Sequence, residues 1–393
     1  MAPDSKEDKD LARTPTRIGV IGCGVISGIY IENAKKLDAI ECVAVADTNL
    51  EAARFRASQY DVPKACSPEE LLADPSIEIV LNLTPHRLHG QVAMQILEAG
   101  KHPYTEKPLT VYTEDSKRVL ALAAQKGLRV GGAPDTFFGG AWQTARKAID
   151  DGLIGEPIAA MANLHARPSP AAEQGPRPTQ TGARATVASA VSFYQTDYFA
   201  YGVSAAFDRG PYYLNALIHL LGPAKSVVGS AKKTFDQRMR FGEKLKVNSP
   251  SHVAGIIEFA NDVTCQFLMT NDVYDTGLPH IEVYGTEGSL RCIDPNNFPG
   301  PIYLRKPDSS ELVEIKCQHG YNQNSRGVGV ADMAVAIRNG RPHRASGEMA
   351  AHVVEIINAI HESAADGQRH ILSTTCAQPK ALPLGLADWT IDD

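Results

Sequence analysis

The sequence lacks the features that mark several broad classes of protein. No apolar run approaches the roughly 20 residues that a membrane-spanning helix needs. The formal net charge of the 393 residues is −6, so the overall charge does not favour binding to nucleic acid or to a membrane surface. Residues 1–16 contain no apolar segment typical of a secretory signal, and we interpret them as a disordered tail.

Cysteine is scarce and scattered. No Cys-x-x-Cys pair occurs, and several cysteines lie within apolar runs, where they behave as small buried hydrophobic residues. The seven are Cys23, Cys42, Cys66, Cys265, Cys292, Cys317 and Cys376. This pattern predicts a reduced, cytoplasmic protein without a zinc site or another metal site.

What the chain does contain, in its first third, is a regular alternation of apolar runs and amphipathic segments. We expect strands at 17–22, 40–47, 77–85, 101–108 and 128–133, with helical patterns between them. Near-continuous apolar strands separated by helices predict a parallel sheet covered on both faces. Ligands bind at the carboxyl ends of such strands. Gly22, Asp47, Thr84 and Glu106–Lys107 are therefore expected along one edge.

A glycine-rich turn, GCGVISG at residues 22–28, follows the first expected strand. Gly22 would allow the tight turn, and Gly24 would let the backbone approach a pyrophosphate. Ser27 holds the third position of the G-x-G-x-x-G/A pattern, where it is small but not the consensus residue. Asp47 ends the next strand at about the spacing expected for a carboxylate that binds the ribose hydroxyls and repels a 2′-phosphate. We therefore predict NAD rather than NADP, bound through Gly22, Gly24, Val25, Ile26 and Asp47.

Four stretches together resemble the Gfo/Idh/MocA family of oxidoreductases, which includes glucose–fructose oxidoreductase and inositol dehydrogenase. They are residues 19–30 with 43–47, residues 81–109, residues 207–223 and residues 281–298. The resemblance implies an α/β protein, with a doubly wound Rossmann domain followed by an α/β domain that has a large, mainly antiparallel sheet. We expect these domains at 17–134 and 135–380, with a C-terminal tail at 381–393. The resemblance also implies a homodimer or homotetramer formed through the second sheet.

The tripeptide Glu106-Lys107-Pro108 follows an expected strand. An ammonium there could hydrogen-bond a carbinol oxygen and stabilise negative charge on it. The resemblance assigns this catalytic task to Lys107, and it assigns Glu106 to contact the cofactor or to orient the lysine. It also places Thr84, Pro85 and His89 beside the cofactor, although His89 could equally be a structural histidine at a helix start.

The expected acid–base partner departs from the commonest family pattern. Many members carry Asp-x-Gly-x-His-x-x-Asp, whereas here Tyr212 and Asn215 hold the histidine and second aspartate positions, as in the glucose–fructose oxidoreductase branch. Tyrosine is a competent general acid, so we predict a proton-relaying or substrate-orienting hydroxyl at Tyr212. A packed helix tyrosine is the alternative. Asp208 could orient the site or cap the helix, and His219 is expected to be a buried structural histidine.

Residues 167–186 are rich in Pro, Ala, Gly and Thr and cannot form a core, so we expect a mobile flap at the border of the site. His165 and Arg167 end the strand before it. They could face the substrate, but a solvated strand end is an equal alternative.

These patterns predict an NAD-dependent oxidoreductase for a carbohydrate-like small molecule. A hydride would pass between the nicotinamide and a secondary alcohol of a sugar, glycoside or cyclitol. Lys107, Tyr212 and Asp208 would act at the carbinol oxygen, with His165 also near the substrate. Two alternatives remain at this point: cleavage of a glycoside by transient oxidation and elimination, and a non-catalytic NAD-binding sensor.

Overall fold

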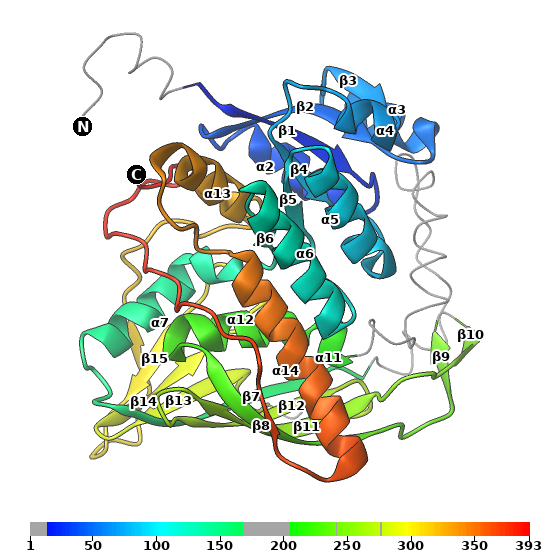
Figure 1. Ribbon diagram of the computed structural model, residues 1–393. Helices are drawn as coiled ribbons and strands as arrows, with labels where there is room; N and C mark the ends of the chain where they lie inside the picture. The colour runs from blue at the N-terminus through cyan, green and yellow to red at the C-terminus, as the bar shows by residue number, and fades with distance from the viewer. Residues whose placement is uncertain (1–13, 168–204, 241, 276) are drawn as a thin grey trace.

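The first part of the chain folds around a six-stranded sheet in the order β3-β2-β1-β4-β5-β6 (Figure 1). The structure is a computed structural model that describes residues 14–167, 205–240, 242–275 and 277–393. The strands are β1 (Thr16–Ile21), β2 (Ile40–Ala46), β3 (Lys64–Cys66), β4 (Ile79–Asn82), β5 (His102–Thr105) and β6 (Gly131–Gly132). Every neighbouring pair is parallel. This order is that of a doubly wound dinucleotide-binding sheet, so the predicted fold class is confirmed for this part.

Helices cover both faces of this sheet. They are α2 (Ser27–Ala34), α3 (Leu50–Gln59), α4 (Pro68–Leu72), α5 (His89–Glu98) and α6 (Thr113–Lys126), with a 3₁₀ turn η1 at His86–Leu88. Along β2, Val45 packs into one apolar cluster and its neighbours Ala44 and Ala46 pack into another. Burial of successive residues on opposite faces explains the near-continuous apolar runs of these strands.

The second part contains a nine-stranded sheet in the order β16-β15-β14-β13-β7-β12-β11-β8-β17. Only β7 and β12 pair in parallel, and the other neighbours are antiparallel, as predicted. The strands are β7 (Pro157–His165), β8 (Ala224–Lys232), β11 (His252–Phe259), β12 (Thr264–Thr270), β13 (Ile281–Gly285), β14 (Gly288–Cys292), β15 (Ile302–Arg305), β16 (Val313–Ile315) and β17 (His370–Ile371). A separate hairpin joins β9 (Gln237–Arg240) to β10 (Glu243–Lys246).

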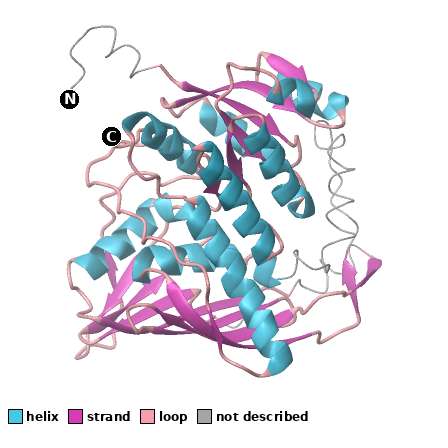
Figure 2. Cartoon of the chain, in the orientation of Figure 1, coloured by secondary structure: helices cyan, strands magenta, loops and turns pink. Residues whose placement is uncertain are grey.

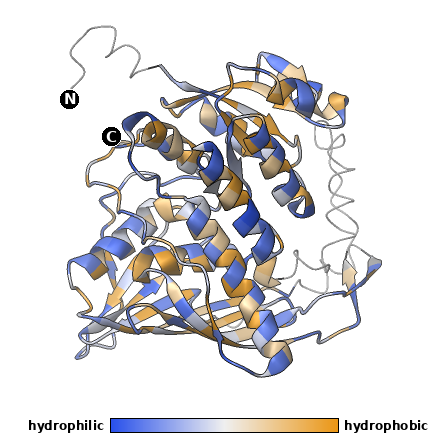
Figure 3. Ribbon diagram, in the orientation of Figure 1, coloured by the Kyte–Doolittle hydropathy of each residue, from blue (hydrophilic) through white to orange (hydrophobic). Residues whose placement is uncertain are grey.

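In the described part of the chain, helices cover only one face of the nine-stranded sheet (Figure 2). The helical segments of the second part of the chain are η2 (Thr136–Phe138), α7 (Gly140–Asp150), α11 (Ala205–Asp208), α12 (Gly210–Leu221), α13 (Val328–Asn339) and α14 (Gly347–Asp366). Of these, α13 packs against β2 and β6 of the six-stranded sheet. All twelve residues of α12 are buried. Hydrophobic residues mark the strands of both sheets in Figure 3, and hydrophilic residues gather on the outer sides and ends of the helices.

The C-terminal residues run back past the second part and end near α13 (Figure 1). Arg344 Nη1 donates to Asp332 at 2.6 Å and Arg344 Nη2 donates to Asp392 at 2.6 Å. The hydroxyl of Tyr321 donates to the backbone oxygen of Thr390. These bonds fasten the last residues of the chain to the loop before α13 and to α13 itself.

Some sequence predictions fall where the structure gives no description. The expected flap at 167–186 lies outside the described residues apart from Arg167, and the expected tail at 1–16 does so apart from residues 14–16. Among the described residues, no helix combines the length and the hydrophobicity needed to cross a membrane.

Candidate active site

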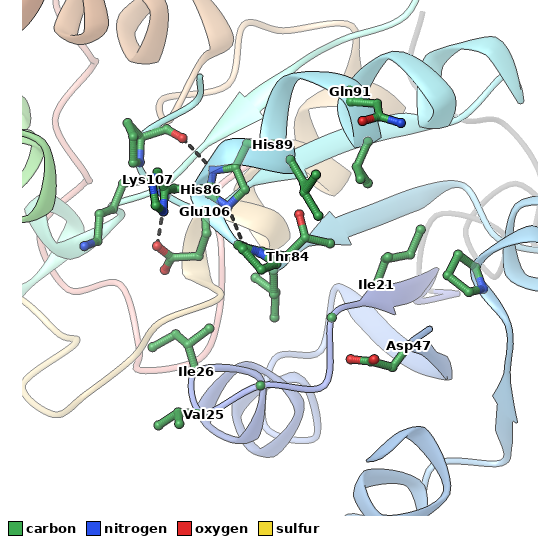
Figure 4. Close-up of a pocket in the computed structure, with 18 of the residues that line it drawn as sticks. Ile21, Val25, Ile26, Asp47, Thr84, His86, His89, Gln91, Glu106 and Lys107 are labelled. Carbon is green, nitrogen blue, oxygen red and sulfur yellow. Dashed lines mark hydrogen bonds between the residues drawn. The ribbon is translucent and has the colours of Figure 1, made fainter. Parts of the chain in front are cut away.

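A cavity of about 780 Å³ lies at the carboxyl edge of the six-stranded sheet, where this edge meets the start of α12. Asp47 lies toward one end of the cavity and Lys107 toward the other (Figure 4). The lining includes most of the predicted site residues. They are Gly22, Gly24, Val25, Ile26, Asp47, Thr84, Pro85, His89, Glu106, Lys107, Asp208 and Tyr212.

The glycine turn has the geometry that a pyrophosphate requires. Gly22 adopts φ +103°, and a Cβ there would lie 2.5 Å from the backbone oxygen of Leu83. A Cβ on Gly24 would meet no atom within 4 Å, and Gly24 lines the cavity. The Ser27 hydroxyl donates to Gly24 O at 2.7 Å, so the non-consensus serine closes the turn. Gly24 therefore leaves room for a ligand, whereas a side chain at position 22 would clash with the backbone.

The side chains of Asp47 and Arg56 form hydrogen bonds with the backbone of this turn. Asp47 Oδ2 accepts from the backbone N–H of Cys23 at 2.8 Å. Arg56, which the sequence reasoning missed, donates from Nη2 to Gly24 O at 2.8 Å and from Nε to Cys23 O at 3.4 Å. Only 6% of Arg56 is exposed, because α3 packs it under the turn. These hydrogen bonds from the protein's own side chains therefore fix the shape of the turn.

His89 joins the loops that follow β4 and β5. Its Nδ1 lies 2.6 Å from Pro108 O and its Nε2 lies 2.8 Å from Thr84 O (Figure 4). Desolvation lowers the pKa of this buried imidazole, and a neutral imidazole donates only one hydrogen bond at a time. Asn82 completes the cluster, since its side chain donates to His89 O and accepts from the Thr84 hydroxyl. His89 therefore lines the cavity, and each ring nitrogen faces a backbone carbonyl, of which a neutral imidazole can hydrogen-bond only one.

Lys107 connects the two parts of the chain. Its Nζ donates to Asp208 Oδ1 at 2.6 Å and to Asp208 O at 2.7 Å. Glu106 holds the backbone at Lys107, since its carboxylate accepts from the Lys107 backbone N–H at 2.8 Å and from the Tyr30 hydroxyl at 3.0 Å. The Lys107 and Asp208 side chains are only 15% and 19% exposed, so the ion pair is largely shielded from water.

Tyr212 lies among three cations. Lys107 Nζ is 5.4 Å from the centre of its ring, and the guanidinium carbons of Arg326 and Arg209 are 5.9 and 6.0 Å away. Tyr212 is 6% exposed and lines the cavity, so it is both packed in its helix and accessible to a ligand. Arg326 is a residue that the sequence reasoning missed.

Three other residues of interest lie elsewhere. His165 pairs in register with Thr270, does not line the cavity, and follows the buried Leu164, so alternation turns it to the face opposite the helices. Asn215 is buried and donates to Pro134 O at 2.9 Å. His219 is fully buried as expected, and burial lowers its pKa to about 3. The described residues contain no group of three or more His, Cys, Asp or Glu arranged to hold a metal ion.

Comparison with known proteins identifies the family. One family model, described as an oxidoreductase family with an NAD-binding Rossmann fold, matches residues 16–132. A second, the GFO/IDH/MocA C-terminal domain, matches residues 142–291. The chain belongs to the Gfo/Idh/MocA oxidoreductase family. This membership confirms the resemblance noted in the sequence and makes the protein an NAD-binding oxidoreductase.

Curated relatives of this Gfo/Idh/MocA protein act on sugars and cyclitols, according to their names. The 1,5-anhydro-D-fructose reductase of Ensifer adhaerens is 26% identical over 363 residues, which are 91% of this chain and 99% of the relative. The myo-inositol 2-dehydrogenase of Thermotoga maritima is 30% identical over 142 residues, 36% of this chain and 42% of that protein. Levoglucosan dehydrogenase in complex with NADH and L-sorbose has the same fold. Its TM-score is 0.75 at 21% identity, over 92% of this chain and all of that one.

Proposed function

We propose that this protein is an NAD-dependent dehydrogenase for a secondary alcohol of a sugar, glycoside or cyclitol. The observation that carries the proposal is the meeting of Lys107, Asp208 and Tyr212 at one end of a cavity whose other end is a dinucleotide-type glycine turn. The names of the curated relatives support the class of substrate. We also propose residues 17–134 as the NAD-binding domain and residues 135–380 as the substrate-binding and oligomerisation domain.

The residues at the glycine end of the cavity fit NAD better than NADP. Gly24 leaves room for a pyrophosphate, and Asp47 lines the cavity where a ribose would follow. Glu69 also lines this end, and the described lining residues include no arginine that could bind a 2′-phosphate. When bound, the nicotinamide supplies the chemistry of hydride transfer.

The chain's own residues handle the substrate oxygen and its proton. The Lys107 ammonium can donate to the carbinol oxygen and stabilise negative charge on it, and Asp208 and Glu106 hold the lysine in place. Tyr212 is the acid–base group: in alcohol oxidation its ionised hydroxyl takes the carbinol proton as the hydride leaves carbon with the C–H electron pair. In carbonyl reduction Tyr212 returns that proton.

A lysine substitution tests this function. Lys107→Met should lower kcat at least about 10²-fold, because the oxygen loses its charged hydrogen-bond donor, while NAD binding persists. NADH formation should be measured over a panel of sugars, glycosides and inositols, and NAD binding by calorimetry. Lys117→Met is the matched control, because Lys117 pairs with Glu114 on the exposed side of α6. Wild-type turnover by Lys107→Met would refute the proposal.

Assays over the same panel of compounds distinguish the dehydrogenase from the two alternative functions. Product that forms without net NADH would indicate glycoside cleavage through transient oxidation and elimination. Tight NAD binding with no turnover of any compound would indicate a sensor.

We further propose that subunits pair through the face of the nine-stranded sheet that the helices of the described segments leave open. Val228 of β8 and Ile256 of β11 pair in register on this face and are 38% and 42% exposed. Exposed apolar side chains on a broad sheet face are typical of a surface that a partner covers. A second copy of the chain is the partner that the C-terminal domain of this family implies.

A further inference from the structure

Arg56 lies in the last turn of α3 and packs against the glycine turn. Its guanidinium donates to three oxygens: Nη2 to Gly24 O at 2.8 Å, Nε to Cys23 O at 3.4 Å and Nη1 to Gln59 Oε1 at 2.8 Å. Arg56 is 6% exposed and is not one of the residues that line the cavity. The guanidinium therefore contacts the side of the glycine turn that faces away from the cavity.

No carboxylate of the described residues forms an ion pair with Arg56, whose three acceptors are all neutral. Asp47 also borders the turn, but its carboxylate accepts from the backbone N–H groups of Cys23 and Asn49, each at 2.8 Å. A guanidinium stays protonated in proteins, and a buried charge without a paired counter-charge costs free energy. Such a cation is expected where a bound anion completes the charge balance.

The hydrogen bonds of Arg56 also set the direction of two peptide groups. The Cys23–Gly24 and Gly24–Val25 bonds are both trans, and the N–H of a trans peptide points opposite to its C=O. Because Arg56 holds the oxygens of Cys23 and Gly24, the N–H groups of Gly24 and Val25 point away from it. Gly24 and Val25 line the cavity, so these two N–H groups are directed toward a ligand there.

We propose that Arg56 is a positioning residue for the pyrophosphate of NAD, an inference that rests on the proposed cofactor site at the glycine turn. Arg56 directs the N–H groups of Gly24 and Val25 toward the cofactor and places one positive charge behind them. It acts through the turn and does not touch the cofactor. Because the guanidinium is buried, water and salt screen its attraction to the two negative charges of the pyrophosphate only weakly.

A purely structural role for Arg56 would have different consequences. Asp47, which is expected to bind the adenosine ribose, is hydrogen-bonded to the same turn through Cys23 N. Loss of a brace that only keeps the turn folded should therefore weaken binding of adenosine as much as binding of phosphate-bearing ligands. Loss of the charge and of the directed N–H groups should weaken only ligands that carry the pyrophosphate.

The test compares Arg56→Gln, which removes the charge but keeps a hydrogen-bond donor, with Arg56→Lys, which keeps the charge. Arg56→Gln should raise the Kd for NAD and for ADP-ribose about tenfold and should change the Kd for adenosine less than about twofold. Arg56→Lys should recover most of the affinity for ADP-ribose. Arg54→Met is the matched control, because Arg54 is exposed on the same helix, and it should leave all three affinities unchanged.

Calorimetry measures NAD and ADP-ribose, and displacement of bound NADH, followed by its fluorescence, measures adenosine. With a substrate found in the panel, the KM for NAD should rise in Arg56→Gln by about the same factor as the Kd, while kcat changes less than about twofold. The kcat should persist because neither the charge nor the directed N–H groups act at the carbinol carbon.

An unchanged affinity for NAD in Arg56→Gln, or equal losses for adenosine and ADP-ribose, would overturn the proposal. If Arg56→Gln does not fold, Arg56→Lys decides, because a tenfold loss of both ADP-ribose and adenosine in that variant would also overturn it. Wild-type protein that binds NAD but oxidises no compound would count against the dehydrogenase function alone, and the binding comparison would still decide the role of Arg56. Wild-type protein that does not bind NAD would overturn both.

Discussion

The two sheets of this chain use their surfaces in opposite ways. The six-stranded sheet buries both faces under helices and presents a ligand site at its carboxyl edge. Among the described residues, helices cover only one face of the nine-stranded sheet, and this part contributes to the site through α11 and α12, which lie on that face. A sheet with two buried faces can bind ligands only at its edge. A sheet with one open face can support a site on its helix-covered face and bind a partner on the other face.

The largest expected effect is a difference between substitutions on the two faces of the nine-stranded sheet. Ile257 is fully buried and Ile256, the residue before it in β11, is 42% exposed. Ile257→Asp should unfold the protein or lower the free energy of unfolding by roughly 4 kcal/mol or more, because it buries an unpaired charge. Ile256→Asp should leave the fold intact but dissociate the assembly.

Circular dichroism and sedimentation velocity measure these two outcomes. Unfolding by both substitutions would show that the open face is covered within the subunit. A wild-type protein that sediments as a monomer would contradict subunit pairing.

The next effect contrasts two glycines at the edge of the six-stranded sheet. Gly22→Ala forces a side chain into the left-handed region of φ and against Leu83 O, so it should lower the free energy of unfolding by about 3 kcal/mol and abolish NAD binding. Gly24→Ala should keep stability within about 0.5 kcal/mol. Its methyl group would project into the cavity, so NAD affinity should fall about tenfold or more.

Urea unfolding and calorimetric NAD titration of the two variants provide the comparison. Equal loss of stability in both would mean that the turn does not distinguish the two positions as the geometry indicates.

The smallest effect concerns Asp135, at the junction between the two sheets. Burial raises the pKa of Asp135 to about 6, above its unfolded value of about 3.9. Between these values the folded chain holds a proton that the unfolded chain has released, so this group's contribution to stability is lost as pH rises. Asp135→Asn cannot ionise, and its amide oxygen can still accept from Gly327 and Gly329. Relative to wild type, the variant should gain about 1–3 kcal/mol between pH 4 and pH 7.5.

Urea unfolding of both proteins at the two pH values checks this prediction. A difference in unfolding free energy that is independent of pH would show that Asp135 does not titrate in this range.

The structure also shows which parts of the site can be predicted from sequence. Gly22, Asp47 and Lys107 each follow a strand with a local apolar pattern, so topology alone gathers them. Tyr212 required the family resemblance, because a helix tyrosine has no local signal for catalysis. Arg326 gave no signal, since its place depends on residues far away in the sequence, such as Asn33, whose side chain donates to Arg326 O at 2.9 Å.

The remaining differences between the sequence predictions and the structure also come from long-range contacts or from elements too short to show a pattern. His89 was located at the cavity, but its contacts depend on how two loops fold together. His165 lies on a strand whose alternation defines two faces, and sequence does not show which face the helices cover. The strand β3 has three residues and α4 has five, which is too short for a periodic pattern to stand out.

The fastening of the C-terminus has a practical consequence. Asp388 accepts from the backbone N–H of Tyr321, and the Tyr321 hydroxyl donates to Thr390 O. Tyr321 lies in the same loop as Arg326, only a few residues before it. A carboxypeptidase that trims the chain would therefore remove contacts from the loop that carries Arg326, whose guanidinium lies 5.9 Å from the centre of the Tyr212 ring. We expect protein that has lost its last residues to turn over more slowly, even with every cavity-lining residue intact.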